Sequence, residues 1–327
     1  MKKKIALVSG GYSKEDVVSF NSAKEIAVSI DPEKYEVFLV LINREKWVYI
    51  DKTGNEFSLD KNDFTVKVNS KIIEFDAVFI TIHGTPGEDG KLQGYFDMIK
   101  MPYNTCNAFT SSLTFNKVAT KKYLETLGIK TAPYFFLRRN QNYEVKEIVK
   151  KLGLPMFVKP NAGGSSFGVT KVKEEKELAN AIENAFAEDN EVLIESFIDG
   201  TEVTCGLIKT KNGKIIFPAT EIVSKNEFFD YDAKYNGEAD EITPARITDK
   251  QMEAVKSLSS DIYDALDCFG IVRIDYLMRN DELFVIEANT VPGMSAASIV
   301  PQQAEAYGMT TRELFSIVLQ ETLERKA

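Results

Sequence analysis

The sequence predicts an α/β (α+β) chain, with an N-terminal parallel-sheet domain followed by two α+β subdomains. Three observations lead to this fold class. Short apolar strands alternate with helical segments in the first third of the chain, a glycine- and serine-rich loop joins two strands in the middle third, and a long hairpin lies in the last third. A chain of 327 residues with 44% hydrophobic residues can bury more than one core.

The first third contains three apolar strands and a helix between the first two. The strands are expected over residues 5–8, 35–42 and 76–82, and apolar residues recur at helical spacing over 15–30. Strand and helix in alternation indicate a parallel sheet, which binds ligands at the carboxyl ends of its strands. Gly10-Gly11 and His83-Gly84 follow two of these strands. We therefore expect an N-terminal domain over residues 1–104 with a ligand site at this edge.

The rest of the chain divides into a central subdomain over residues 105–198 and a C-terminal subdomain over 199–327. The central part is expected to contain helices over 114–127, 143–152 and 174–187, and strands over 134–137, 156–159, 169–172 and 192–197. The C-terminal part is expected to contain strands over 203–208 and 215–222, a long polar stretch over 224–243, a helix over 249–266, a hairpin over 273–289 and a final helix over 311–324.

The charge and cysteine content argue against several classes of protein. Lys+Arg total 40 and Asp+Glu 49, so the net charge of −9 is a poor match for nucleic acid or an anionic membrane. Three cysteines far apart indicate reduced thiols, and a single histidine argues against a structural zinc site. The apolar stretch behind the N-terminal lysines is too short for a signal peptide, and no run approaches a membrane span. We expect a cytoplasmic protein.

The strongest functional signal is the late hairpin. Arg273 and Asp275 on one strand, and Glu287 and Asn289 on the next, are spaced so that each pair faces one side of the sheet. A turn at 280–281 brings Asp275 roughly opposite Glu287, and two facing carboxylates repel unless a cation lies between them. Their oxygens and the Asn289 carboxamide suit Mg²⁺ bound with substrate phosphates. The alternative is a solvated polar face, and the nearby tight turn at 292–295 favours the ligand site.

A second signal is Lys159 followed by the glycine- and serine-rich segment 161–168. Backbone N–H groups of such a loop can close around phosphate oxygens. Residues 164–168 also match the G-x-S-x-G pattern of a hydrolase, but His83 precedes the serine and the loop joins two strands. A phosphate site is therefore favoured over an esterase, with a plain flexible loop as the other alternative.

Two weaker signals follow the N-terminal strands. In the segment 83–90, His83 could be structural, and Glu88 and Asp89 could cap the next helix. In the segment 10–15, Glu15 enters the first turn of a helix and could hold an amino group. Together these segments place an acid and an imidazole at neighbouring strand ends.

These motifs together resemble the D-alanine–D-alanine ligase family, ATP-grasp enzymes of peptidoglycan synthesis. The resemblance covers nearly the whole chain, and its segments appear in the family's order: 10–19, 83–94, 156–172, 195–202, 230–235, 270–275 and 287–298. It implies an ATP-grasp fold in which the two α+β subdomains clasp ATP. It also implies that two D-alanine molecules are joined through an acyl phosphate, with release of ADP and phosphate.

The resemblance also implies roles at the amino-acid sites. Glu15 would bind the ammonium group of the first D-alanine, helped by Ser165 and Tyr235, and His83 would lie near that substrate. Tyr235 would lie on a lid over residues 224–243 that closes the site to water. Arg273 and the Gly293 backbone would stabilise the developing oxyanion, and Ser298 would bind the carboxylate of the second substrate.

For ATP and metal, the resemblance implies that two lysines reach the phosphates, a serine loop covers them, a backbone segment binds adenine and one glutamate binds the ribose. Two Mg²⁺ ions, with Mn²⁺ as an alternative, would be held by Asp275, Glu287 and Asn289. The residues implied at ATP are Lys117, Lys159, Ser165, Ser166, Glu195, Ser196, Ile198, Glu202, Lys234 and Asn289. Family members are usually dimers, so we expect a homodimer with small-molecule substrates.

Several alternatives stay open. The chain could be a D-alanine–D-lactate or D-serine ligase, although Tyr235 favours an amine nucleophile because hydroxy-acid members tend to carry Phe there. It could be another ATP-grasp carboxylate–amine ligase. It could also be a nucleotide- or amino-acid-binding regulator, but such a protein would lack a metal ligand or Arg273, and all are present.

Overall fold

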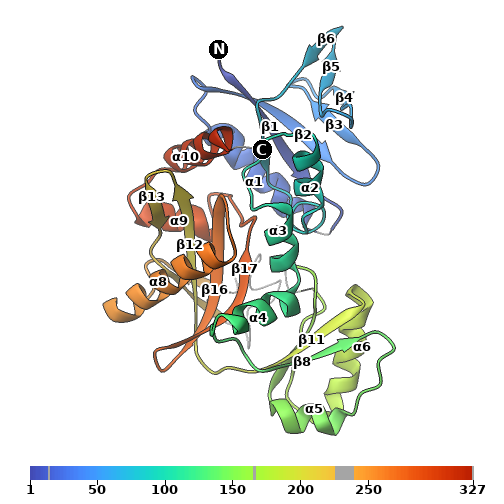
Figure 1. Ribbon diagram of the computed structural model, residues 1–327, viewed down its shortest axis with the longest axis vertical. Helices are drawn as coiled ribbons and strands as arrows, with labels where there is room; N and C mark the ends of the chain where they lie inside the picture. Colours follow the sequence, from blue (N-terminus) through green and yellow to red (C-terminus); the bar gives the residue numbers. More distant parts are fainter. Residues whose placement is uncertain (14, 165–166, 225–238, 326–327) are drawn as a thin grey trace.

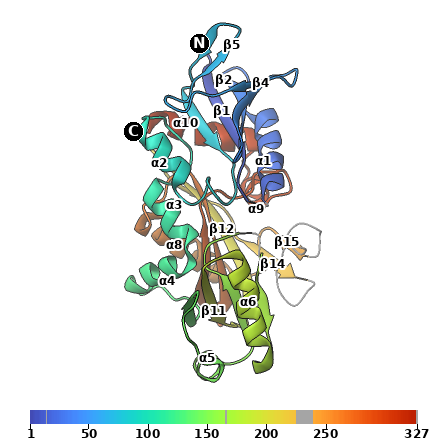
Figure 2. The same cartoon turned by 90° about the vertical axis from the view of Figure 1, so that its right-hand side faces the viewer.

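The computed structural model describes residues 1–13, 15–164, 167–224 and 239–325. Three main β-sheets with their helices lie along the long axis of the molecule (Figures 1 and 2). The N-terminal sheet lies at one end, the sheet of the middle third at the other, and the sheet of the last third between them. Within the described ranges, no helix is both long and apolar enough to cross a membrane.

The N-terminal sheet has the strand order β4-β3-β2-β1-β7. As predicted, its centre is parallel: β1 (Lys3–Gly10) pairs with β2 (Tyr35–Ile42) and β7 (Ala77–Ile80), and α1 (Asp16–Ser29) connects the first two. The sheet as a whole is mixed, because antiparallel strands extend it on one side. The added strands are β3 (Trp47–Ile50) and β4 (Glu56–Ser58), which are too short to show a clear hydrophobic period in the sequence. A separate two-stranded ribbon is formed by β5 (Val66–Val68) and β6 (Lys71–Ile73).

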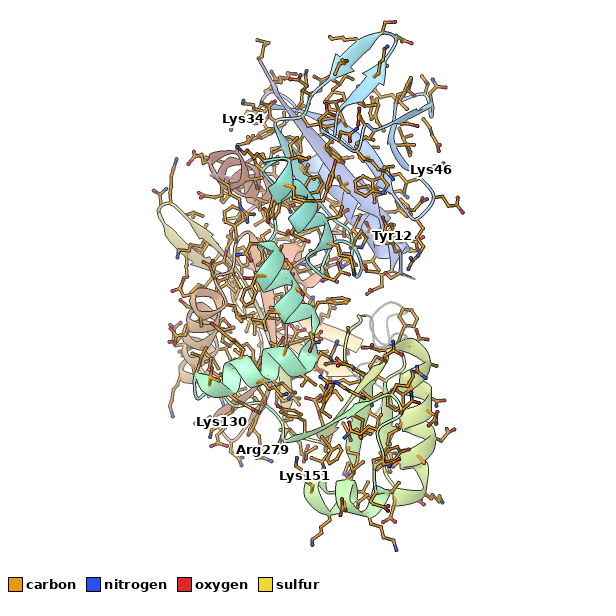
Figure 3. All side chains as sticks on the ribbon, turned by 45° about the vertical axis from the view of Figure 1, so that its right-hand side comes forward. Tyr12, Lys34, Lys46, Lys130, Lys151 and Arg279 are labelled. Carbon is orange, nitrogen blue, oxygen red and sulfur yellow. The ribbon has the colours of Figure 1, made fainter. Side chains whose placement is uncertain are left out.

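Both faces of β1 are buried. Ile5 and Leu7 belong to one core cluster, which also contains residues of α1 and α10 (Thr311–Glu324), and Ala6 and Val8 belong to another. The helix α10, at the opposite end of the chain, packs against α1 and β7 (Figure 1). Two-sided burial explains the continuous apolar run in this strand. The loop after β1 lies at the end of the strand that faces the other sheets, where Figure 3 shows Tyr12.

The helix predicted over residues 114–127 is confirmed as α4 (Lys117–Thr126), but the helix before it, α3 (Ala108–Phe115), was not predicted. Both follow α2 (Lys91–Met98). The predicted start was too early because Asn116 adopts an extended conformation and its side chain accepts a hydrogen bond from the Ala119 N–H at 2.8 Å. An asparagine that caps a new helix interrupts the previous one. Lys117 therefore stands at a helix start.

The central sheet is antiparallel, with the order β10-β9-β11-β8. The glycine- and serine-rich loop connects two of its strands, as the sequence predicted. The predicted helix at 174–187 begins as a short 3₁₀ turn. The elements are β8 (Tyr134–Arg138), α5 (Val145–Leu152), β9 (Met156–Pro160), β10 (Thr170–Val172), η1 (Glu175–Glu177), α6 (Leu178–Glu188) and β11 (Glu191–Ser196).

The last sheet has the order β15-β14-β12-β16-β17, and β13 pairs with the end of β12. The single strand predicted over 215–222 is two strands that pair with different halves of β12, with Pro218 between them. Proline lacks the N–H that a continuous ladder needs. The elements are β12 (Thr201–Thr210), β13 (Gly213–Ile216), β14 (Thr220–Ser224), β15 (Ala239–Ile242), α8 (Asp249–Ala265), β16 (Ile271–Arg279), β17 (Glu282–Asn289) and α9 (Ile299–Ala306).

The β16–β17 hairpin has the predicted register. Asn280 and Asp281 both have positive φ, 49° and 65°, as a two-residue hairpin turn requires. Asp275 pairs with Glu287, and Arg273 with Asn289. An irregularity after Asp275 shifts the register in the rest of the hairpin. The four polar residues therefore lie together at the end of the hairpin away from its turn.

Candidate active site

Two adjoining cavities lie between the sheets. One, of about 460 Å³, lies between the central and last sheets and contains both predicted lysines, Lys117 and Lys159. The other, of about 510 Å³, reaches the N-terminal sheet and contains Glu15 and His83. Arg273 lines both cavities, as do Lys117 and Glu287. A ligand that fills one cavity can therefore meet a ligand in the other.

Arg273 and Asp275 form the centre of the site. The Nε and Nη2 atoms of Arg273 donate to the two Asp275 oxygens, both at 2.8 Å. Asp275 also accepts from Asn289 Nδ2 at 3.0 Å and from the Thr204 hydroxyl. Burial lowers the pKa of Arg273, but Asp275, Glu287 and other carboxylates outweigh burial and raise it well above its usual range. Arg273 is thus a permanent cation where the cavities meet.

The oxygen atoms at the hairpin fit a hard cation. Asp275 and Glu287 face each other across the two strands, with the Asn289 carboxamide beside them. In the described part of the chain, no group of three or more His, Cys, Asp or Glu side chains has a metal-binding arrangement. Two carboxylates and one amide are an incomplete set by themselves. Such a set suits Mg²⁺, which keeps waters or substrate phosphates as its other ligands.

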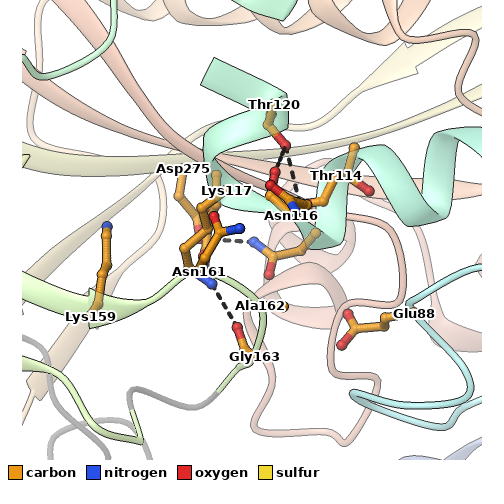
Figure 4. Close-up of polar contacts among 12 residues, drawn as sticks. Glu88, Thr114, Asn116, Lys117, Thr120, Lys159, Asn161, Ala162, Gly163 and Asp275 are labelled. Carbon is orange, nitrogen blue, oxygen red and sulfur yellow. Dashed lines mark hydrogen bonds and ion pairs between the residues drawn. The ribbon is translucent and has the colours of Figure 1, made fainter. Parts of the chain in front are cut away.

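Lys117 is held where helix α4 meets the glycine-rich loop. Its Nζ donates to the Gly163 carbonyl at 2.6 Å (Figure 4) and lies 3.9 Å from Glu287 Oε2. Asn161 fixes this junction, because its carbonyl accepts from the Lys117 N–H at 3.1 Å and its side chain accepts from the Val118 N–H at 2.8 Å. Lys117 therefore lies beside both the loop and the hairpin.

Lys159 belongs to a buried ion-pair cluster that the sequence analysis missed. The carboxylate of Glu195 binds Lys159 through one oxygen and Lys121 Nζ, at 2.5 Å, through the other. Burial raises the pKa of Glu195, but the two lysines outweigh burial and lower it to about 2. Only backbone contacts were expected from this segment. The four-residue spacing of Lys117 and Lys121 on one helix was the available signal for Lys121.

The wall of the first cavity between the central and last sheets is partly polar and partly aromatic. Ser196, Ile198 and Glu202, which the resemblance assigns to ATP, line this cavity together with Phe157 and Phe197. The Ser196 hydroxyl is directed elsewhere, because it donates to the Leu152 carbonyl at 2.8 Å. The apolar area of this wall suits a flat ring system.

Glu15 is buried where the first-strand loop meets two glycine-containing segments. The Tyr12 N–H donates to the Thr85 carbonyl at 2.9 Å, which joins the two N-terminal motifs. A Cβ atom at Gly84 would lie 2.8 Å from Glu15 Oε2, and one at Gly164 would lie 2.6 Å from Glu15 Oε1. A side chain at either position would therefore displace the Glu15 carboxylate, and Gly84 also has a positive φ of 68°. The predicted closeness of an acid and an imidazole segment is observed, and the phosphate-type loop reaches the same carboxylate.

His83 and Glu88 are both uncharged at neutral pH, for the same reason. Burial lowers the pKa of His83 to about 4, helped by Arg273, and His83 Nε2 has no hydrogen-bond partner among the described residues. Burial raises the pKa of Glu88 to about 8, helped by nearby Glu15. Glu88 accepts from the Gly84 N–H at 2.6 Å rather than capping helix α2.

Ser298 and Gly293 also line the second cavity. Ser298 precedes α9, and its Oγ accepts from the Ser295 N–H at 3.1 Å. The Met294 N–H donates to Ser22 Oγ at 3.1 Å, which ties this loop to α1. A Cβ atom at Gly293 would lie 2.8 Å from Ser298 Oγ, so the loop backbone closely approaches this side chain.

Four predicted site residues lie outside the described residues: Ser165, Ser166, Lys234 and Tyr235. Most of the predicted lid, residues 225–238, lies there too. Its flanks are described, since β14 and β15 pair with Ser224 opposite Ala239. Glu221 of β14 and Glu241 of β15 line the first and second cavities respectively, so these strands form part of the site wall.

Comparison with known proteins identifies the family. A model described as D-ala D-ala ligase N-terminus matches residues 4–106, and one described as D-ala D-ala ligase C-terminus matches residues 123–320. The chain is 49% identical over 327 residues to D-alanine–D-alanine ligase of Parabacteroides distasonis, covering 100% of this chain and 99% of the relative. The chain belongs to the D-alanine–D-alanine ligase family. A second relative, from Phocaeicola vulgatus, is 47% identical over 98% of this chain and 99% of its own length.

Solved structures of this ligase family confirm the ATP-grasp fold. The VanG D-Ala:D-Ser ligase from Enterococcus faecalis has a TM-score of 0.88 at 31% identity, covering 98% of this chain and 100% of that one. D-alanine–D-alanine ligase from Bacillus anthracis complexed with ATP has a TM-score of 0.79 at 29% identity, covering 98% of both chains. The protein is thus a ligase, and the esterase interpretation of residues 164–168 is set aside.

Proposed function

We propose that this chain joins two D-alanine molecules to form D-alanyl-D-alanine, using ATP and releasing ADP and phosphate, for peptidoglycan synthesis. The supporting observation is that two cavities meet at Arg273 in a chain of the ligase family that covers 99% of its Parabacteroides distasonis relative. One cavity carries the two lysines and the hairpin carboxylates, and the other carries Glu15 and Ser298.

In the first step, the carboxylate of one D-alanine attacks the γ-phosphorus of ATP, giving an acyl phosphate and ADP. This transfer depends on positioning and on neutralising phosphate charge. Lys117 and Arg273 supply positive charge where the cavities meet, and Lys159 supplies it within the first cavity. Asp275, Glu287 and Asn289 would hold two Mg²⁺ ions, or Mn²⁺, which neutralise phosphate charge when bound.

The first D-alanine would bind through its ammonium group at Glu15. An uncharged His83 beside that group does not repel it, and this agrees with the lowered pKa of His83. Ser165 and Tyr235 are proposed to help Glu15. Arg273 keeps the reacting carboxylate at the boundary between the cavities.

In the second step, the amine of the second D-alanine attacks the acyl carbon and phosphate leaves. Ser298 would bind the carboxylate of this substrate, and Arg273 with the Gly293 N–H would stabilise the oxyanion that develops on the acyl oxygen. An acyl phosphate hydrolyses in water, so a lid over residues 224–243, carrying Lys234 and Tyr235, is proposed to exclude solvent.

ATP would lie along the first cavity. The backbone of residues 195–198, with Glu195, Ser196 and Ile198, would meet adenine, and Glu202 would meet the ribose. Ser166 and its loop would cover the phosphates. We also propose domain boundaries near residues 104 and 198, a homodimer, and a cytoplasmic reaction without nucleic-acid or membrane partners.

Two other second substrates are the main alternatives. The structural similarity to a D-Ala:D-Ser ligase makes D-serine the principal competitor, and D-lactate would be the substrate of a depsipeptide ligase. The proposal is tested by phosphate release from ATP with Mg²⁺ and D-alanine alone, or with added D-serine or D-lactate, and by the mass of each product. Dipeptide from D-alanine alone is expected. A mixed product formed in preference would move the assignment to the alternative, and no product would overturn the proposal.

The metal assignment has a matched test. Asp275→Asn should release little phosphate at any Mg²⁺ concentration, whereas phosphate release by the wild type should rise with Mg²⁺. Asp281→Asn, an exposed position at the turn of the same hairpin, should leave both unchanged. Full activity of Asp275→Asn would count against this site.

A further inference from the structure

Glu241 is a second-cavity carboxylate with no role so far. It lies on β15, pairs with Ile222 of β14, and lines the cavity together with Arg273 and Ser298. In the described part of the chain its carboxylate accepts one hydrogen bond, at 3.0 Å from Gln302 Nε2. The same Nε2 also donates to the Ala297 carbonyl at 2.9 Å. The orientation of Glu241 is therefore fixed from helix α9.

Gln302 connects Glu241 to the Ser298 end of the cavity. The two residues are four positions apart, and the Gln302 N–H donates to the Ser298 carbonyl at 3.2 Å. Side chains four apart on a helix share a face. The carboxylate of Glu241 is thus held near the wall where Ser298 lies.

Four glutamates line this cavity, and three of them belong to other parts of its wall. Glu15 and Glu88 lie at the N-terminal loops, and Glu287 lies opposite Asp275 on the hairpin. Glu241 is the remaining glutamate, and it lies toward α9. A free amino acid brings both a carboxylate and an ammonium group, and a buried charge needs an opposite charge near it.

The electrostatic surroundings of Glu241 favour a cation. Burial raises the pKa of Glu241, while Arg273 and the Gln302 hydrogen bond lower it, and burial has the larger effect. The charged carboxylate is therefore incompletely compensated. A cation beside it would offset the remaining cost of burial.

We propose that Glu241, oriented by Gln302, binds the ammonium group of the second amino acid and makes the second site select an amino acid over a hydroxy acid. The inference rests on the proposed function. D-Lactate is the matched probe, because it is D-alanine with a hydroxyl group in place of the ammonium group. Without the charge of Glu241, the second site should bind D-alanine more weakly but bind D-lactate about as well as before.

The test compares wild type with Glu241→Gln, which keeps the shape and an acceptor for Gln302. The measured quantities are the KM for D-alanine at the second site, the inhibition constant of D-lactate against dipeptide formation, and the KM for ATP. We expect the second-site KM to rise about tenfold or more, while the other two change less than about twofold. Glu305→Gln is the control, because this glutamate on α9 carries the same charge but is exposed and lines neither cavity.

Other results would overturn the inference. An unchanged second-site KM, or an equal rise in the D-lactate constant, would mean that Glu241 only shapes the pocket or Arg273. If Glu241→Gln does not fold, Gln302→Leu keeps the charge and removes its support, and a second-site KM raised by less than about twofold would then reject the proposal. A wild-type protein that makes no dipeptide would instead defeat the proposed function.

Discussion

Arg273 binds both carboxylate oxygens of Asp275, two residues further along the same strand, at 2.8 Å each. The guanidinium is therefore fixed between the hairpin carboxylates and the second cavity. Lysine carries the same charge but cannot make this planar two-point contact. We expect Arg273→Lys to lower kcat about 100-fold or more, measured as phosphate release at saturating substrates. Arg279→Lys, on the same strand but exposed, should not change kcat, and a loss below about threefold in Arg273→Lys would contradict the role.

Glu195 neutralises two lysines in a buried cluster, and Lys121 is 2% exposed. Glu195→Gln would leave the Lys121 charge buried without the carboxylate that neutralises it, with only the Ala132 carbonyl as an acceptor. We expect a loss of about 3 kcal/mol in the free energy of unfolding, measured with urea at pH 7. The matched control is Glu282→Gln, which breaks an exposed pair with Lys130 and should cost less than about 1 kcal/mol. Equal losses of unfolding free energy in the two variants would contradict the prediction that the buried ion pair contributes more to stability than the exposed one.

The Glu195 cluster also predicts a pH dependence. The lysines lower the pKa of Glu195 to about 2 in the folded protein, and the unfolded value is about 4.3. Its contribution is therefore fully present above pH ~4.3 and is lost as the pH falls toward 2. The stability difference between wild type and Glu195→Gln should shrink over this range in urea titrations. A difference that stays constant with pH would exclude this linkage.

His83 is the single histidine of the chain, so its imidazole signals in an NMR spectrum are unambiguous. Burial lowers its pKa to about 4, so the ring should stay neutral from pH 8 to about pH 5. The unfolded value is about 6.5, so the folded protein loses stability from this group as the pH falls from 6.5 through 4. Titration of the imidazole near pH 6.5 in the folded protein would contradict the buried, neutral assignment.

Glu88 has the opposite behaviour. Burial and Glu15 raise its pKa to about 8, and the unfolded value is about 4.3. Its contribution to stability is present below pH ~4.3 and is lost as the pH rises through 8, at about 1 kcal/mol per pH unit. Glu88→Gln does not ionise, so its stability should rise relative to wild type between pH 5 and pH 8. Glu74→Gln, at an exposed position, should show no such trend.

The hairpin could be predicted because its signals are local. Strand residues at i and i+2 share a face, and Asn280-Asp281 accepts the positive φ values of a two-residue turn, so Asp275 and Glu287 face each other whatever surrounds them. The break at Asn116 was missed because an asparagine is tolerated within a helix unless its side chain finds an N–H to cap. The antiparallel strands β3 and β4 were missed because three or four residues show no reliable period.

The sequence by itself determined the parallel centre of the first sheet, the composition of the hairpin and the glycine loop, and the family to which these motifs belong. The tertiary structure decided which glutamates act as charges. Two lysines face Glu195 and lower its pKa to about 2, whereas burial and nearby Glu15 raise the pKa of Glu88 to about 8. A pKa depends on burial and on charges from distant parts of the chain, and only the folded arrangement brings these together.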